Sequence, residues 1–143
     1  MPDSISVIGF DFGTSWIGTA IGQTQTGTAS PLKSLRVINN KPDWDAIKLL
    51  IDEWTPDRLI VGLPKHMDDK SHQMTQKAER FSRQLEGRFH LPVELIDERL
   101  TTREAWQIIE QQASHRLNKP DIDCVAAVLI TETWLNHQAS QDS

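Results

Sequence analysis

The sequence predicts an α/β fold in which a mixed five-stranded sheet is flanked by helices, in the element order βββαβαβαα. Two observations support this fold class. Three strand patterns follow one another near the N-terminus, and helical and strand patterns alternate from residue 43 onward. Consecutive strands form antiparallel hairpins, whereas strands separated by helices are joined by crossovers and lie parallel.

The first three strands are short apolar runs separated by turn residues. We expect them at Ser6–Asp11, Gly18–Gly22 and Pro31–Ile38. A Gly-Thr-Ser-Trp segment separates the first two strands, and a Gln, Thr and Gly segment precedes the third. Both segments are typical of turns, so the three strands should form a meander.

Helices and strands alternate in the rest of the chain. Apolar residues recur at helical spacing, as Trp44, Ile47 and Ile51 do. The expected elements are a helix at Asp43–Trp54, a strand at Arg58–Gly62, a helix from Ser71 to about Gly87, a strand at Leu91–Asp97, and helices at Thr101–Gln112 and about Asp121–Asn136. We expect residues 1–137 to form a single domain and the polar residues 138–143 to form a disordered tail.

The composition is that of a soluble protein, with 38% hydrophobic and 24% charged residues. No apolar run approaches the ~20 residues needed to cross a bilayer, and the first residues lack the pattern of a signal peptide. The single cysteine, Cys124, lies in an apolar run, so a buried thiol is expected rather than a disulfide or a nucleophile. These features favour a cytoplasmic protein without membrane contact.

The net charge is −5, but the basic residues are concentrated in the middle of the chain. Residues 58–119 carry 11 basic and 9 acidic side chains, whereas residues 120–143 carry 4 acidic and no basic ones. The overall charge argues mildly against a nucleic-acid partner. A locally basic segment can nevertheless bind phosphates, and an ordinary solvated surface explains the same pattern.

Acidic residues fall at or near the edge where the carboxyl ends of the parallel strands should meet. Asp11 ends the first strand, Asp97 and Glu98 end the last strand, and Asp123 lies in the first turn of the final helix. Carboxylates that converge repel one another, and a hard divalent cation relieves that repulsion. A bound Mg²⁺ or Mn²⁺ could activate water and stabilise phosphoryl oxygens.

Each acid also has a simpler structural interpretation. The helix dipole favours Asp123 in a first turn, and Glu98 could pair with a neighbouring arginine. Asp97 and Glu98 are adjacent, so in a strand they point to opposite faces and at most one would join a cluster. Asp11 is hardest to explain in this way, because no cationic residue is its obvious neighbour in the sequence and burial of an unpaired charge is costly.

The Asp-Phe-Gly sequence at Asp11 also occurs in two kinds of kinase. A protein kinase would need an upstream glycine-rich loop and a lysine-bearing strand, and neither precedes residue 11. A sugar kinase clamps ATP between two large lobes, and 143 residues supply one lobe at most. A small ATP-binding phosphotransferase is therefore the least favoured of the functions considered.

Four motifs are spread in order from residue 10 to residue 127. They are Phe10-Asp-Phe-Gly13 with Ile17-Gly18, Ile60-Val-Gly-Leu-Pro64 with His66-Met-Asp68, Asp97-Glu-Arg-Leu-Thr-Thr102, and Asp123 with Ala126-Ala127. With these motifs the sequence closely resembles the YqgF family, whose RNase H-like members are described as Holliday-junction resolvases and as pre-16S rRNA nucleases. The second and third motifs are the most specific part of the resemblance.

The resemblance implies a single RNase H-like nuclease domain, a hydrolase that cleaves phosphodiester bonds with one or two Mg²⁺ or Mn²⁺ ions. It assigns catalysis and metal binding to Asp11, Glu98 and Asp123, with Asp97 as the alternative to Glu98. The implied partner is nucleic acid, with precursor 16S rRNA preferred over branched DNA, and no coiled-coil pattern requires more than a monomer or weak homodimer. A non-catalytic RNA-binding factor in ribosome assembly is the alternative from another functional class.

The turn after Asp11 departs from the family pattern, which usually has a basic residue there. It reads Thr14-Ser15-Trp16, and Trp16 could stack on an unpaired base or pack on the domain itself. The candidate phosphate-binding residues are Lys65, Lys70, Arg99, Arg103, Arg116 and Lys119, with Lys77, Arg80 and Arg83 as further cations that could simply be solvated on a helix.

Overall fold

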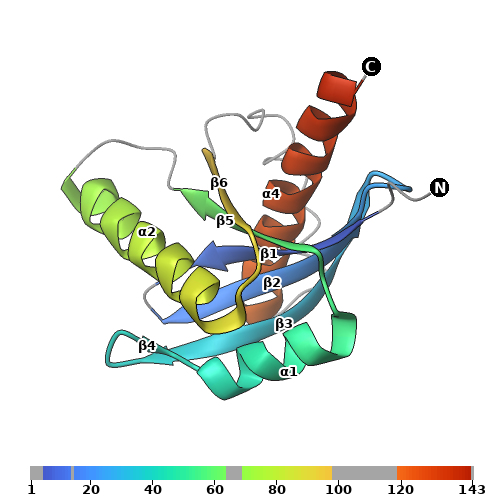
Figure 1. Cartoon of the computed structure of the whole chain (residues 1–143). Coiled ribbons are helices and arrows are strands. Elements are labelled where there is room, and N and C mark those ends of the chain that lie inside the picture. The colour runs from blue at the N-terminus through green and yellow to red at the C-terminus, as the bar shows by residue number, and fades with distance from the viewer. Residues whose placement is uncertain (1–4, 14, 64–68, 98–118, 143) are drawn as a thin grey trace.

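A computed structural model describes residues 5–13, 15–63, 69–97 and 119–142. These residues form a six-stranded mixed sheet in the order β4-β3-β2-β1-β5-β6, with helices on both faces (Figure 1). The expected α/β class and mixed sheet are confirmed. The expected number of five strands was too low by one, because the two-residue strand β4 (Lys41–Pro42) gave no strand pattern of its own.

The N-terminal half of the sheet is an antiparallel meander. Strands β1 (Ser6–Phe12), β2 (Trp16–Gln23) and β3 (Thr28–Ile38) pair in sequence order. The turn from β3 to β4 has positive φ at both central residues, 53° at Asn39 and 62° at Asn40. Positive φ at both positions defines a type I′ turn, and asparagine tolerates this conformation.

The other half of the sheet is parallel, as expected from the alternating pattern. Strand β5 (Arg58–Leu63) pairs with β1, and β6 (Val93–Asp97) pairs with β5. The crossovers contain helices α1 (Trp44–Trp54) and α2 (Asp69–Phe89). The helix expected at residues 101–112 lies outside the described residues.

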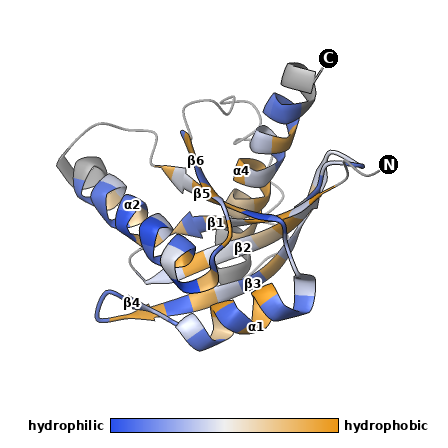
Figure 2. Cartoon of the chain, viewed as in Figure 1, coloured by the Kyte–Doolittle hydropathy of each residue, from blue (hydrophilic) through white to orange (hydrophobic). Residues whose placement is uncertain are grey.

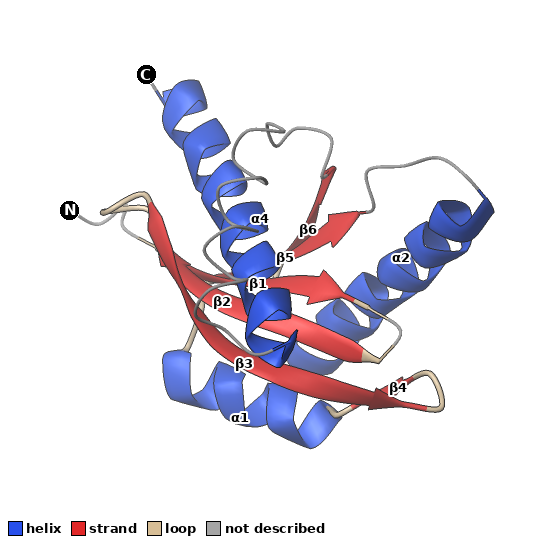
Figure 3. Ribbon diagram, turned by 180° about the vertical axis from the view of Figure 1, so that it is seen from behind, coloured by secondary structure: helices blue, strands red, loops and turns tan. Residues whose placement is uncertain are grey.

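Two apolar cores lie on opposite faces of the sheet. Helices α1 and α2 cover one face, and α4 (Lys119–Asp142) covers the other, as the view from behind shows (Figure 3). In Figure 2 hydrophobic and hydrophilic colours alternate along α1 and α2, as expected of amphipathic surface helices. No helix in the described part of the chain is long and apolar enough to cross a membrane.

Helix α4 is longer at both ends than the sequence suggested. It begins at Lys119, with Pro120 in its first turn, where the missing N–H of proline costs no helical hydrogen bond. It ends at Asp142, so residues 138–142, expected in a disordered tail, are helical. The physical reason is that no glycine or proline follows Asn136 to end the helix.

Candidate functional site

Asp11 lies at the carboxyl end of β1, on the face of the sheet that α4 covers. Side chains alternate along a strand. Ile8 and Phe10 belong to the core beneath α1 and α2, and Phe12 packs against that core, whereas Val7 belongs to the core beneath α4. Asp11 therefore shares the face of Val7, and it is half-buried there. The apolar neighbours of Asp11 in the sequence point away from it, into the larger core.

Two glycines allow α4 to approach β1 and β2 closely. A Cβ atom on Gly9 would overlap Thr131 Oγ1, and one on Gly22 would lie 2.7 Å from Thr131 Cγ2. Thr131 is fully buried, and its hydroxyl donates a 2.7 Å hydrogen bond to the Ala127 carbonyl oxygen. This packing fixes the position of α4 over the strand that carries Asp11.

The N-terminal turns of α4 lie at the same end of the sheet as Asp11. Cys124, which is buried as expected, has its Sγ 3.8 Å from Ser34 Oγ on β3. Ser34 pairs with Gly18 on β2, and Gly18 pairs with Asp11. Two strand spacings are about 10 Å. The backbone of Asp123, which precedes Cys124, is thus brought to the face and end of Asp11; its side chain is outside the described part.

Asp97 lies on the opposite face from Asp11. It is the last residue of β6 and pairs with Leu63 of β5. The preceding Ile96 belongs to the core beneath α4, whereas Val93 packs against the core beneath α1 and α2. Alternation therefore directs Asp97 toward the α2 side. Glu98, the alternative acid, lies outside the described residues.

A glycine separates Asp11 from β6 on the α4 face. Phe10 pairs with Val61, so the next residues along, Asp11 and Gly62, are neighbours, and Gly62 pairs with Ile96. This row of three strands spans about 10 Å at the usual strand spacing. Because Gly62 has no side chain, β5 places no side chain between Asp11 and the end of β6.

A cation that the sequence did not single out lies on the face of Asp11. Trp16 pairs with Arg36 of β3, and the guanidinium carbon lies 5.8 Å from the centroid of the Trp16 ring. Leu35 and Val37 belong to the α1–α2 core, so Arg36 between them points to the α4 side. Trp16 is half-buried and has a partner within the chain, which agrees with the packing interpretation. The positive charge missing from the turn is therefore present on the neighbouring strand.

The alternation of β3 was a signal that could have identified Arg36. Arg36 lies between Leu35 and Val37 in a strand that the sequence predicted. Its proximity to Trp16, however, depends on the pairing register of β2 and β3, which the sequence pattern does not specify.

The six predicted phosphate-binding cations have side chains outside the described part of the chain. Lys65, Arg99, Arg103 and Arg116 lie outside the described residues, and Lys70 and Lys119 lie in α2 and α4 with side chains outside the described part. Among the side chains that the structure does describe, no three acids, histidines or cysteines form a metal-binding group. Of the three acids assigned to the metal, Asp11 alone has a described side chain.

Comparison with known proteins identifies relatives over nearly the whole chain. Residues 5–137 match the RuvX family model, described as Holliday junction resolvase. A protein of Actinobacillus pleuropneumoniae serotype 5b (strain L20), named "Putative pre-16S rRNA nuclease", is 47% identical over 134 residues, which are 93% of this chain and 98% of the relative. A protein of the same name from Aeromonas salmonicida (strain A449) is 46% identical over 94% of this chain and 97% of its own length.

Solved structures of similar fold include two resolvases. The T. thermophilus RuvC structure in complex with a Holliday junction substrate aligns with a TM-score of 0.64 at 11% identity, covering 94% of this chain and 96% of that one. The fowlpox virus Holliday junction resolvase aligns with a TM-score of 0.56 at 11% identity, covering 93% and 99%. At this identity the likeness concerns the fold, which is RNase H-like, as the resemblance implied.

Proposed function

The chain belongs to the RuvX family, and on this premise we propose that it is a metal-dependent nuclease that processes precursor 16S rRNA. The observation that carries the proposal is the position of Asp11. Asp11 lies at the carboxyl end of β1, which pairs in parallel with β5, on the face met by the first turns of α4. In open α/β sheets, sites form at the carboxyl ends of the strands.

We assign metal binding to Asp11, Glu98 and Asp123. Three carboxylates offer the hard oxygen donors that Mg²⁺ and Mn²⁺ prefer. Glu98 is favoured over Asp97, because Asp97 lies on the α2 side, opposite the face of Asp11. Gly62, which has no side chain, leaves room between Asp11 and the end of β6, which supports a site at this edge.

When bound, the divalent ions would activate a water molecule and neutralise charge on the phosphate and the leaving 3′-oxygen. The side chains of this protein would orient the phosphodiester. Arg36, held beside Trp16 on the same face, would bind a phosphate oxygen near the cleaved bond. No protein nucleophile is required by this chemistry.

Precursor 16S rRNA is the preferred substrate because relatives 46–47% identical bear the name "Putative pre-16S rRNA nuclease". Branched DNA is the second candidate, since the family model is described as Holliday junction resolvase. We further propose that one nuclease domain, acting in the cytoplasm as a monomer or weak homodimer, carries the activity. A resolvase cuts two strands and would need a symmetric dimer.

The decisive test compares both substrates in one assay. Purified protein is incubated with precursor 16S rRNA and with a four-way DNA junction, in Mg²⁺, in Mn²⁺ and in excess chelator. We expect the protein to cleave the rRNA in metal, and we expect excess chelator to abolish this cleavage. Cleavage of the junction alone would assign the protein as a resolvase. Tight RNA binding without cleavage in either metal would instead identify a non-catalytic assembly factor.

A further inference from the structure

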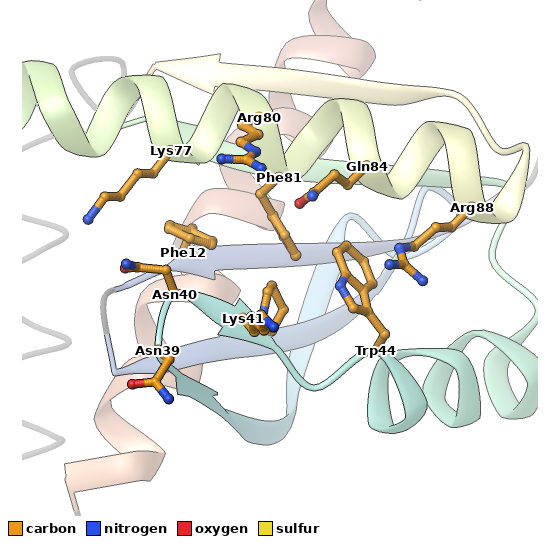
Figure 4. A pocket seen from close by; sticks show the side chains of 11 residues that line it. Phe12, Asn39, Asn40, Lys41, Trp44, Lys77, Arg80, Phe81, Gln84 and Arg88 are labelled. Atoms are coloured by element: carbon orange, nitrogen blue, oxygen red, sulfur yellow. The ribbon is translucent and has the colours of Figure 1, made fainter.

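A basic pocket lies on the face of the sheet opposite Asp11. It has a volume of about 650 Å³, within the ~300–1,000 Å³ typical of ligand sites, and lies between α2, the β3–β4 turn and the start of α1. Figure 4 shows the side chains that line it: Lys77, Arg80 and Arg88 from α2, Lys41 from β4, Trp44 from α1 and Phe12 from β1.

The lining of the pocket is strongly cationic. Four of its described residues are lysine or arginine, and none is aspartate or glutamate. Within the described part of the chain, the ion pairs are Lys48–Asp52 and Arg58–Glu94, so none of these four cations is neutralised by a carboxylate there. Like charges gathered in a concave surface attract anions and raise their local concentration. The pocket is therefore suited to a phosphate group.

The floor of the pocket is aromatic. The Trp44 ring stacks on Phe81 at a centroid distance of 5.6 Å, and the Arg88 guanidinium lies 4.3 Å from the Trp44 ring centroid. The ring centroids of Phe12 and Phe81 lie 5.1 Å apart. Phe12 is only half-buried, and part of its ring faces the pocket. The Trp44 ring has three partners, Phe81, Phe89 and Arg88, whereas the Phe12 ring has Phe81, so we take Phe12 as the aromatic surface for a ligand. An aromatic ring beside cations is the combination that binds unpaired nucleotides.

The β3–β4 turn adds neutral polar groups to the same pocket. The type I′ conformation leaves both asparagine side chains exposed, and Asn39 and Asn40 line the rim. An amide side chain both donates and accepts hydrogen bonds, as a sugar hydroxyl or base edge requires.

We propose that this pocket binds an unpaired nucleotide of the nucleic-acid substrate, next to the bond that is cleaved. Lys77 and Arg80 hold its phosphate, and Phe12 stacks on its base. The proposal rests on the proposed nuclease function. It is linked to the cleavage site by the chain itself, because Phe12 directly follows Asp11 and the two point to opposite faces of β1. A single strand of nucleic acid that passes over the end of β1 would contact both Asp11 and Phe12.

The experiment measures binding without cleavage. A labelled single-stranded RNA of ten nucleotides and a blunt RNA duplex are titrated with the protein in excess chelator, over a range of salt concentrations. The double variant Lys77→Gln/Arg80→Gln should bind the single strand at least tenfold more weakly. The plot of log K against log salt has a negative slope. This slope should become less steep by about 0.7 for each phosphate of the single strand that no longer meets a cation. Phe12→Leu should weaken single-strand binding at least fivefold while leaving duplex binding unchanged.

The matched control is Lys33→Gln/Lys48→Gln, which removes the same number of positive charges. Lys33 is exposed on β3 and does not line this pocket, and Lys48 is paired with Asp52 on α1. This control should keep binding within about twofold of wild type. Equal losses in the two double variants, or wild-type binding by Lys77→Gln/Arg80→Gln, would overturn the proposal.

The two proposals fail separately. Because Asp11→Asn removes no pocket residue, it should retain single-strand binding in chelator. If the protein cleaves RNA but the pocket variants bind normally, the pocket assignment is wrong and the nuclease stands. If the pocket variants lose binding but no substrate is cleaved in metal, the pocket stands as the site of an RNA-binding protein.

Discussion

Thr131 of α4 and Gly9 of β1 are in such close contact that a Cβ atom on Gly9 would overlap the Thr131 hydroxyl oxygen and lie 3.2 Å from Thr131 Cβ. The hydroxyl is held in place by its hydrogen bond to Ala127. This contact sets the distance between α4 and the strand of Asp11. The proposed site therefore depends on a packing relationship formed by residues that take no part in the chemistry.

Gly9→Ala should lower the free energy of unfolding by about 1–3 kcal/mol, because the added methyl group overpacks the interface between α4 and β1. Chemical denaturation monitored by circular dichroism measures the change. Gly87→Ala is the matched control: the added Cβ meets nothing within 4 Å, so stability should stay equal or rise by up to about 1 kcal/mol. Equal midpoints for Gly9→Ala and wild type would contradict the close contact.

Thr19→Val should also destabilise the fold, by about 1–3 kcal/mol for each backbone group left unsatisfied. Gly18 pairs with Ser34 and Ala20 with Pro31, so β3 has an extra residue opposite Thr19. The fully buried Thr19 hydroxyl donates to the Lys33 carbonyl at 2.6 Å and accepts from the Lys33 N–H at 2.9 Å. Thermal unfolding would detect the loss.

Thr133→Val serves as the control for Thr19→Val. The Thr133 hydroxyl donates only to the Leu129 carbonyl one helical turn earlier, a bond that adds little to a helix. Its effect should stay within about 0.5 kcal/mol. If both variants unfold at the same temperature, the Thr19 hydroxyl does not stabilise the bulge in β3.

Arg36→Gln should weaken substrate binding and reduce its salt dependence. Removal of one cation that binds a phosphate makes the negative slope of log K against log salt less steep by about 0.7–0.9. The measurement is KM for precursor rRNA at several salt concentrations, with Lys48→Gln on α1 as the equal-charge control. An unchanged salt slope for Arg36→Gln would show that this cation does not contact the substrate.

Glu98→Gln and Asp97→Asn separate the two acids at the end of β6. If Glu98 is a metal ligand, Glu98→Gln should weaken Mn²⁺ binding by more than about tenfold, since even residues that only support ligands cost 10–100-fold. Asp97→Asn should bind Mn²⁺ nearly as wild type, because Asp97 lies on the α2 face. Titration calorimetry measures the Mn²⁺ affinity of each variant. Weaker binding by Asp97→Asn than by Glu98→Gln would assign the metal to Asp97 instead.

The sequence predicted the main architecture because hydrophobic periodicity reports local structure directly. It could not predict β4, since Lys41 and Pro42 form a strand only through pairing with Val37 and Ile38. Helix α4 begins two residues before the expected Asp121, because Pro120 is well suited to a first helical turn although proline is also common in loops.

The site was predictable in part. Asp11 stood out as a charge in an apolar strand, but only strand pairing reveals that its face is shared with Arg36 and bordered by Gly62. The basic pocket depends on contacts between α2 and a turn more than thirty residues earlier in the chain. Such juxtapositions follow from the tertiary fold, which residue spacing alone does not encode.

The central claim is that the Asp11 carboxylate holds the catalytic metal, and single-turnover cleavage of precursor 16S rRNA by Asp11→Asn in Mg²⁺ tests it most directly. Asp97→Asn is the control, because it makes the same chemical change on the opposite face. We expect Asp11→Asn to cleave at least about a hundredfold more slowly at unchanged stability, since loss of a ligand should exceed the 10–100-fold cost of losing a supporting residue. Cleavage by Asp11→Asn at the wild-type rate would contradict the account.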